Sequence, residues 1–90
     1  MEINKNFKNH NGFVSHEQFN RYEEWIFNFN NGYGASVITG SIAYCNEKKP
    51  FELAVLKHGK ICYDTPITDD VISYLTSNEV YELLDRIEQL

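Results

Sequence analysis

The sequence predicts an α+β fold in which a four-stranded antiparallel meander is packed by C-terminal helices. Two observations carry this prediction. Apolar and β-branched residues alternate through much of residues 22–63, in runs separated by residues typical of turns. The last third of the chain instead spaces its apolar residues as an amphipathic helix does. With 90 residues, 42% of them hydrophobic, the chain can build one core.

The first two strands are expected on either side of Asn31-Gly32. The bulky residues before this pair nearly alternate, as in a half-buried strand: Tyr22, Trp25, Phe27 and Phe29. Asn-Gly favours a type I′ turn, because both central residues of that turn need positive φ. A second strand is predicted over residues 34–44, which are rich in β-branched residues, and Gly40 within it indicates a bulge or bend.

The third and fourth strands are expected around His58-Gly59. Phe51, Leu53 and Val55 alternate with other residues, which predicts a strand with one buried face. His58-Gly59 then reverses the chain into a short strand over residues 61–63. The predicted core face is contributed by these strands: Trp25, Phe27, Val37, Leu53, Val55 and Ile61.

Two helices are expected after residue 67. In the first, Thr68 is the N-cap, and a short helix follows through Val71, Ile72 and Leu75. In the second, Thr76 and Glu79 have the spacing of a capping box. Its apolar residues form one stripe: Val80, Leu83, Leu84, Ile87 and Leu90.

Residues 1–20 are polar and rich in Asn, which predicts an irregular N-terminal arm, with residues 21–90 forming a single α+β domain. Ser15 and Gln18 have capping-box spacing and allow a short helical turn within the arm. Helices on one side of a sheet leave its other face and its edges available, so pairing with a second copy is one expectation.

Charge is distributed unevenly along the chain. Residues 1–63 carry seven basic and six acidic residues, whereas residues 64–90 carry one arginine and seven acidic residues, which gives a net charge of −5. The sequence contains neither a membrane-spanning apolar stretch nor a signal peptide, so we expect a soluble cytoplasmic protein. Cys45 and Cys62 are expected to be reduced, apolar filler.

Four segments carry a resemblance to known proteins: NGYGASVI from Asn31, FELAVL from Phe51, ICYDTPITDDVISYLT from Ile61, and EVYELLDRIEQL at the C-terminus. They cover about two-thirds of the chain, and Tyr63 to Ile72 is the most specific part. Together they resemble a family of small bacteriophage proteins of unknown function. The resemblance implies a phage or prophage source and action inside the infected bacterium, and it supplies no catalytic residue.

The leading functional hypothesis is a small non-enzymatic protein that binds a host or defence protein, as an inhibitor for example. The candidate partner-binding residues are acidic and could imitate a row of phosphates: Asp64, Asp69, Asp70, Glu79 and Glu82. The alternative is a nucleic-acid-associated protein with a basic rim formed by Lys48, Lys49, Lys57 and Lys60.

A third class is a small hydrolase or metal enzyme around Asp64 and Asp69. Turn, cap and helix-dipole roles already account for the acidic residues of this segment, so we predict no catalytic residue and no cofactor. His10 and His16, taken with either cysteine, lack the close ligand pairs of a structural zinc site. The sequence therefore predicts no metal site.

Overall fold

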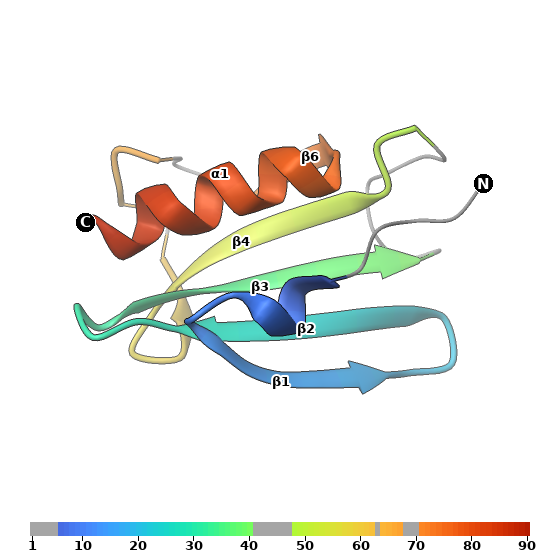
Figure 1. Ribbon diagram of the computed structural model, residues 1–90, viewed down its shortest axis with the longest axis horizontal. Coiled ribbons are helices and arrows are strands. Elements are labelled where there is room, and N and C mark those ends of the chain that lie inside the picture. The colour runs from blue at the N-terminus through green and yellow to red at the C-terminus, as the bar shows by residue number, and fades with distance from the viewer. Residues whose placement is uncertain (1–5, 41–47, 63, 68–70) are drawn as a thin grey trace.

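The computed structural model describes residues 6–40, 48–62, 64–67 and 71–90 (Figure 1). Within these ranges the chain forms one antiparallel sheet and one α-helix, which confirms the α+β class. The elements are the 3₁₀ helix η1 (Asn6–Asn9), the strands β1 (Phe13–Gln18), β2 (Tyr22–Asn28), β3 (Tyr33–Gly40), β4 (Phe51–Lys57), β5 (Lys60–Ile61) and β6 (Ile72–Leu75), and the helix α1 (Ser77–Glu88).

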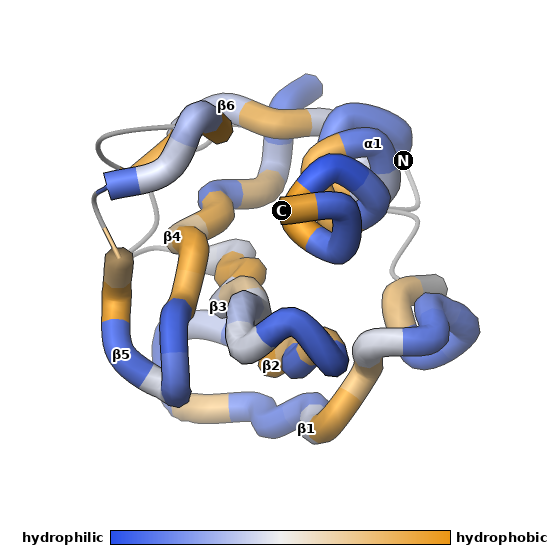
Figure 2. The backbone as a smooth tube through the Cα atoms, turned by 90° about the vertical axis from the view of Figure 1, so that its left-hand side faces the viewer, coloured by the Kyte–Doolittle hydropathy of each residue, from blue (hydrophilic) through white to orange (hydrophobic). Residues whose placement is uncertain are grey.

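Strands β1 to β4 form a meander in which each strand pairs antiparallel with the next. Strands β5 and β6 both pair with β4, β5 near its C-terminal end and β6 near its N-terminal end. Helix α1 and η1 lie on the same side of this curved sheet (Figure 2). The four predicted strands correspond to β2, β3, β4 and the two-residue β5, which pair in this order, and β1 adds a strand that was not predicted.

The core lies between the sheet and the segments that cover this inner face. Trp25, Phe27 and Val37 are buried there, as predicted, together with the apolar stripe of α1. Phe7 of η1 is also fully buried, and its ring meets those of Trp25 and Phe51 edge-on, with centroids 5.1 and 4.9 Å away. A residue of the predicted irregular arm is therefore central to the core.

Strand β1 replaces much of the irregular arm predicted for residues 1–20, and Ser15 and Gln18 lie in this strand rather than in a helical turn. Its pairing with β2 matches Phe13 to Phe27 and His16 to Trp25, with a register shift between residues 13 and 15. A β-bulge of this kind inserts one residue, so side chains three apart reach the same face. The bulge interrupts the alternation of apolar and polar residues by which a strand is recognised in a sequence.

Strand β6 occupies the position of the predicted short helix at Val71, Ile72 and Leu75, so that prediction is wrong. Leu53 pairs with Ile72 and Phe51 with Leu75, again with a register shift between the pairs. Tyr74 takes a φ of 58° within this shift. Ile72 and Leu75 both contact the core, so a bulged strand reproduces the spacing of three that we assigned to a helix.

The hairpin at Asn31-Gly32 is confirmed, but its turn is not type I′. Phe29 N–H donates to the Tyr33 carbonyl and Gly32 N–H to that of Phe29, and of the central residues only Gly32 has positive φ. This is the three-residue loop with glycine in the left-handed region. Asn31 Nδ2 instead donates to the carbonyls of Ile87, Glu88 and Leu90 at 3.0–3.1 Å, which ties the turn to the end of α1.

The reversal at His58-Gly59 is confirmed. Both residues have positive φ, 52° and 82°, and Lys57 pairs with Lys60 across them. The strand that follows is shorter than predicted, and Ile61 is 51% exposed, so its assignment to the core was wrong. Tyr63, Thr68, residues 41–44 and Cys45 lie outside the described residues, and Cys62 carries a free thiol.

The capping box predicted for the C-terminal helix is present. Thr76 Oγ1 accepts a hydrogen bond from Glu79 N–H at 3.2 Å, and Glu79 Oε1 accepts one from Thr76 N–H at 3.0 Å. The buried residues of α1 are four of the five in the predicted stripe, Val80, Leu83, Leu84 and Ile87, whereas Leu90 follows the helix and is partly buried. No helix among the described residues has the length and apolar content needed to cross a bilayer.

Candidate functional site

A groove of about 370 Å³ lies on the outer face of the sheet, opposite α1, and we call it the outer-face groove. Its base consists of side chains that alternate with those of the core along β2, β3 and β4. Residues 59, 61 and 71 also line it. The apolar members of the lining are Ile26, Ile38, Ala54, Leu56, Ile61 and Val71. Most of them are partly exposed, unlike the central residues of the inner face, Trp25, Phe27 and Val37.

Two carboxylates, Glu24 and Glu52, lie in the same lining. Ser36 Oγ donates a hydrogen bond of 2.7 Å to Glu24 Oε2, which fixes the position of that carboxylate at the centre of the sheet. Within the described part of the lining all charged groups are acidic. The groove therefore combines an apolar base with negative charge, which suits a ligand that carries both apolar groups and a cation.

A second hollow of about 420 Å³ lies at the β1–β2 hairpin, where it is lined mainly by polar residues 18–23, Thr39 and Gly40. Its two aromatic rings, Phe19 and Tyr22, stack on each other at 4.6 Å. Because each ring already covers one face of the other, this hollow offers less apolar surface to a ligand than the outer-face groove.

The five acidic residues predicted to bind a partner have different surroundings. Asp64 and Glu82 are exposed, whereas Asp69 and Asp70 lie outside the described residues. Glu79 serves the capping box, and its hydrogen bonds with the Thr76 backbone and side chain lower the pKa of its carboxyl below the ordinary value. Glu79 thus has a structural role in addition to any part in binding.

The four lysines of the alternative hypothesis lie at opposite ends of β4. Lys57 and Lys60 face each other across the β4–β5 hairpin, and Lys57 Nζ lies 5.3 Å from the Tyr33 ring centroid. Lys48 and Lys49 precede the other end of the strand, about 20 Å away for six residues of extended chain. The lysines thus form two separate pairs.

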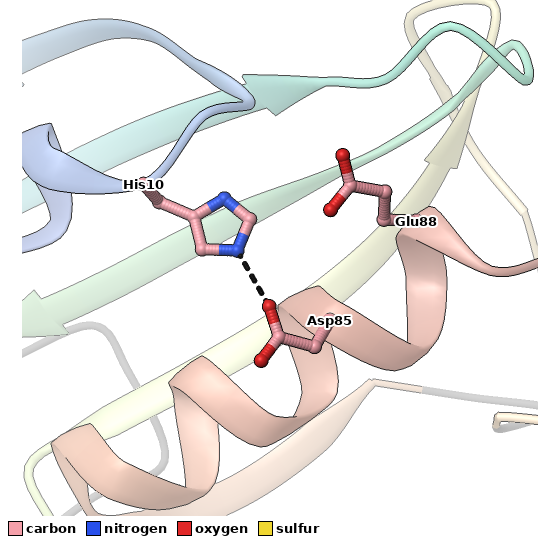
Figure 3. Close-up of side chains that lie close together, drawn as sticks. All are labelled: His10, Asp85 and Glu88. Carbon is pink, nitrogen blue, oxygen red and sulfur yellow. Dashed lines mark hydrogen bonds and ion pairs between the residues drawn. The ribbon is translucent and has the colours of Figure 1, made fainter.

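A histidine and two carboxylates meet where the η1–β1 turn reaches α1 (Figure 3). His10 Nε2 lies 3.0 Å from Asp85 Oδ1, and the ligand atoms of His10, Asp85 and Glu88 all lie within 4.8 Å of one another. Asn11 Nδ2 donates to Glu88 Oε2 at 2.8 Å. We call His10, Asp85 and Glu88 the His–carboxylate cluster.

The imidazole of His10 is held firmly although its partners face solvent. Its side chain is 6% exposed, against 73% for Asp85. The ring packs against Phe27, Phe29 and Tyr81, with centroids 5.6–6.2 Å away. Gly12 N–H donates to Nδ1 at 3.2 Å, so in the neutral ring the proton is on Nε2 and is donated to Asp85.

The sequence alone does not reveal this cluster, because His10 and Asp85 are 75 residues apart. The only local signal is the spacing of Asp85 and Glu88, which places two carboxylates on one helix face. A second such pair joins His16 and Glu23 at 3.0 Å, with the His16 ring stacked 4.8 Å from Trp25.

Comparison of the chain with protein-family models, with curated proteins and with solved structures found no match.

Proposed function

We propose that this protein acts by binding another protein through the outer-face groove and that it catalyses no reaction itself. The observation that carries the proposal is the groove, whose apolar base lies on a sheet face that no described helix covers. Partly exposed Ile26 and Ile38 would be removed from water by a ligand, which favours binding by roughly 25 cal/mol per Å² of apolar area.

The occupant we propose is a segment of a partner protein that carries apolar side chains and at least one Lys or Arg. Glu24, which Ser36 already positions, supplies the complementary charge, and Glu52 lies in the same lining. The net charge of −5 would also speed the encounter with a basic partner at low salt. The resemblance to bacteriophage proteins supports a partner within the infected bacterial cytoplasm, including its defence proteins.

A second copy of the chain fits this groove less well. In a two-fold dimer through this face, Glu24 and Glu52 would meet the same carboxylates of the other copy or lie close to them. Repulsion between like charges at an interface is unfavourable. We therefore expect that the groove stays accessible in the free protein.

A displayed library of random peptides tests the proposal directly. We expect selection on the purified protein to enrich peptides with apolar residues and Lys or Arg. Their affinity should fall at least tenfold for Ile38→Thr and for Glu24→Gln. Val14→Thr is the matched control, since Val14 is exposed on β1, and it should leave the affinity unchanged. Glu82→Gln on α1 separates the groove from the acidic surface expected from the sequence, because only binding through that acidic surface would be weakened by it.

Selected peptides that bind the two groove variants as tightly as the original protein would contradict the proposed site. Dimers that dissociate on Ile38→Thr, seen by sedimentation velocity, would show that the groove holds a second copy instead. Selection of peptides that lack Lys and Arg would show that the groove carboxylates do not contribute to binding.

A further inference from the structure

We propose that the His–carboxylate cluster binds one divalent transition-metal ion of the Zn²⁺ class, and that the ion ties the η1–β1 turn to α1. This inference is independent of the outer-face groove, which lies on the opposite face of the sheet. It also revises the expectation from sequence that the chain has no metal site.

The ligand atoms are close enough to share an ion. They lie within 4.8 Å of one another, and His10 Nε2 and Asp85 Oδ1 are already 3.0 Å apart. Bonds of about 2.0–2.2 Å from zinc to nitrogen and oxygen would bring ligands to roughly 3.3 Å in a tetrahedral site. The exposed side chain of Asp85 can make the small movement required while the buried imidazole stays in place.

The chemistry of the three groups selects the class of ion. Imidazole suits zinc, nickel and copper, whereas magnesium and calcium prefer oxygen ligands alone. Two carboxylates offset the double charge of the ion. Three protein ligands leave one position for water, and Asp85 lies at the solvent side of the cluster.

The surroundings hold the ligand side chains in position, although Nδ1 of His10 accepts a hydrogen bond where a metal-bound imidazole donates one. Aromatic rings hold the imidazole, and Asn11 positions the Glu88 carboxylate by its hydrogen bond of 2.8 Å. Asp85 and Glu88 lie one turn apart on α1, and the neighbouring residues Leu84 and Ile87 anchor the helix in the core. Two of the ligands are therefore preorganised by a rigid element.

One contact must change when the ion binds. A metal on Nε2 displaces the proton from that nitrogen, and the neutral ring then carries its proton on Nδ1. Nδ1 can no longer accept from Gly12 N–H, so this 3.2 Å hydrogen bond is lost and the Gly12 amide shifts. Metal binding thus has a local signature, a changed amide resonance for Gly12, that an ion held elsewhere would not produce.

The test is titration of the chelator-treated full chain with ZnCl₂, followed by calorimetry and by amide resonances. We expect one saturable site, a shift of the Gly12 resonance and a higher melting temperature, whereas MgCl₂ and CaCl₂ produce none of these. Asp85→Asn and Glu88→Gln, separately and together, keep a hydrogen-bond acceptor for His10 and for Asn11 but remove the ligand charge. Each should weaken zinc binding at least tenfold.

Glu82→Gln is the matched control, because it removes the same charge from an exposed position of α1 outside the cluster, and it should change zinc affinity less than twofold. Cys62→Ser serves as a second control against zinc held by the free thiol. Absence of saturable binding, or equal affinity of the Asp85→Asn/Glu88→Gln double variant, would overturn the proposal. Zinc binding that depends on Cys62 alone would overturn it as well.

Discussion

The two faces of the sheet are made by the same strands, yet they differ in what covers them. On the inner face, Trp25, Phe27 and Val37 are at most 1% exposed beneath η1 and α1. On the outer face, Ile26 and Ile38 alternate with these residues along β2 and β3 and remain partly exposed. Two carboxylates lie among the outer apolar side chains, whereas on the inner face, as far as the structure describes it, the buried residues are apolar apart from Thr39 and the His10 imidazole at the rim.

Under the proposed function, this difference separates stability from recognition. Full burial of an aromatic or aliphatic side chain stabilises the folded state by about 1.5–3 kcal/mol. The inner face therefore supplies most of the hydrophobic free energy of folding. Partly exposed side chains contribute less and still have area to bury against a partner. Substitutions should therefore affect unfolding on one face and binding on the other.

The largest effect is expected for Phe7→Ala. Phe7 is fully buried and its ring contacts those of Trp25, Phe27 and Phe51, so truncation leaves a cavity between η1 and the sheet. The free energy of unfolding should fall by about 3–5 kcal/mol. Urea unfolding should be followed by circular dichroism, because removing the Phe7 ring would itself change the fluorescence of Trp25 in the folded protein.

Phe19→Ala is the matched control, because Phe19 is 40% exposed in the β1–β2 turn. A loss for Phe7→Ala no greater than for Phe19→Ala would show that η1 is not part of the core. That result would also return the N-terminal segment to the irregular arm expected from the sequence.

Much of the inner face could be predicted from sequence, because alternation in β2 and β4 and the stripe of α1 follow regular periods. Strands β1 and β6 could not. Each contains a register shift, so that two inward-facing residues lie three apart in the sequence instead of two. These pairs are Phe13 with His16 and Ile72 with Leu75. A spacing of three suggests a helix or no regular structure, and only pairing with β2 or β4 shows that it belongs to a strand.

The candidate sites depend even more on tertiary structure. Alternation predicts that Ile26 and Ile38 face away from the core, but not that Glu24 is held there by Ser36. The His–carboxylate cluster joins the two ends of the chain, and no local pattern links His10 to Asp85. Asn31 was assigned to its turn for its backbone, whereas its side chain binds the last carbonyls of α1.

The capping box at the start of α1 makes a pH-dependent contribution to the free energy of unfolding. Hydrogen bonds with the Thr76 backbone and side chain lower the pKa of Glu79 from its ordinary value of 4.5. A carboxyl whose pKa is lower in the folded protein than in the unfolded one stabilises the folded state at any pH above its pKa in the unfolded chain. This contribution disappears as the pH falls through its pKa in the folded protein. Wild type should thus exceed Glu79→Gln in stability at neutral pH, and the two should converge below pH 4.5.

Urea unfolding of both proteins at a series of pH values, with Trp25 fluorescence as the signal, measures this convergence. Glu82→Gln provides the comparison, since Glu82 lies outside the capping box on the same helix. A constant difference between wild type and Glu79→Gln down to low pH would mean that the capping box acts through hydrogen-bond geometry without the charge.

The smallest effect on stability is expected for Ile38→Thr on the outer face. Threonine keeps the β-branched shape that strands favour, and Ile38 is only partly buried, so unfolding should change by less than about 1 kcal/mol. Val37→Thr, one residue away on the inner face, places a hydroxyl in the fully buried core and should cost several times more. Both variants introduce threonine, and Ile38→Thr removes one carbon more than Val37→Thr, so a larger loss for Val37→Thr in urea unfolding can only come from the difference between the faces. Equal losses would mean that the outer face contributes to the core as much as the inner one, and the apolar groove would then need no partner to explain it.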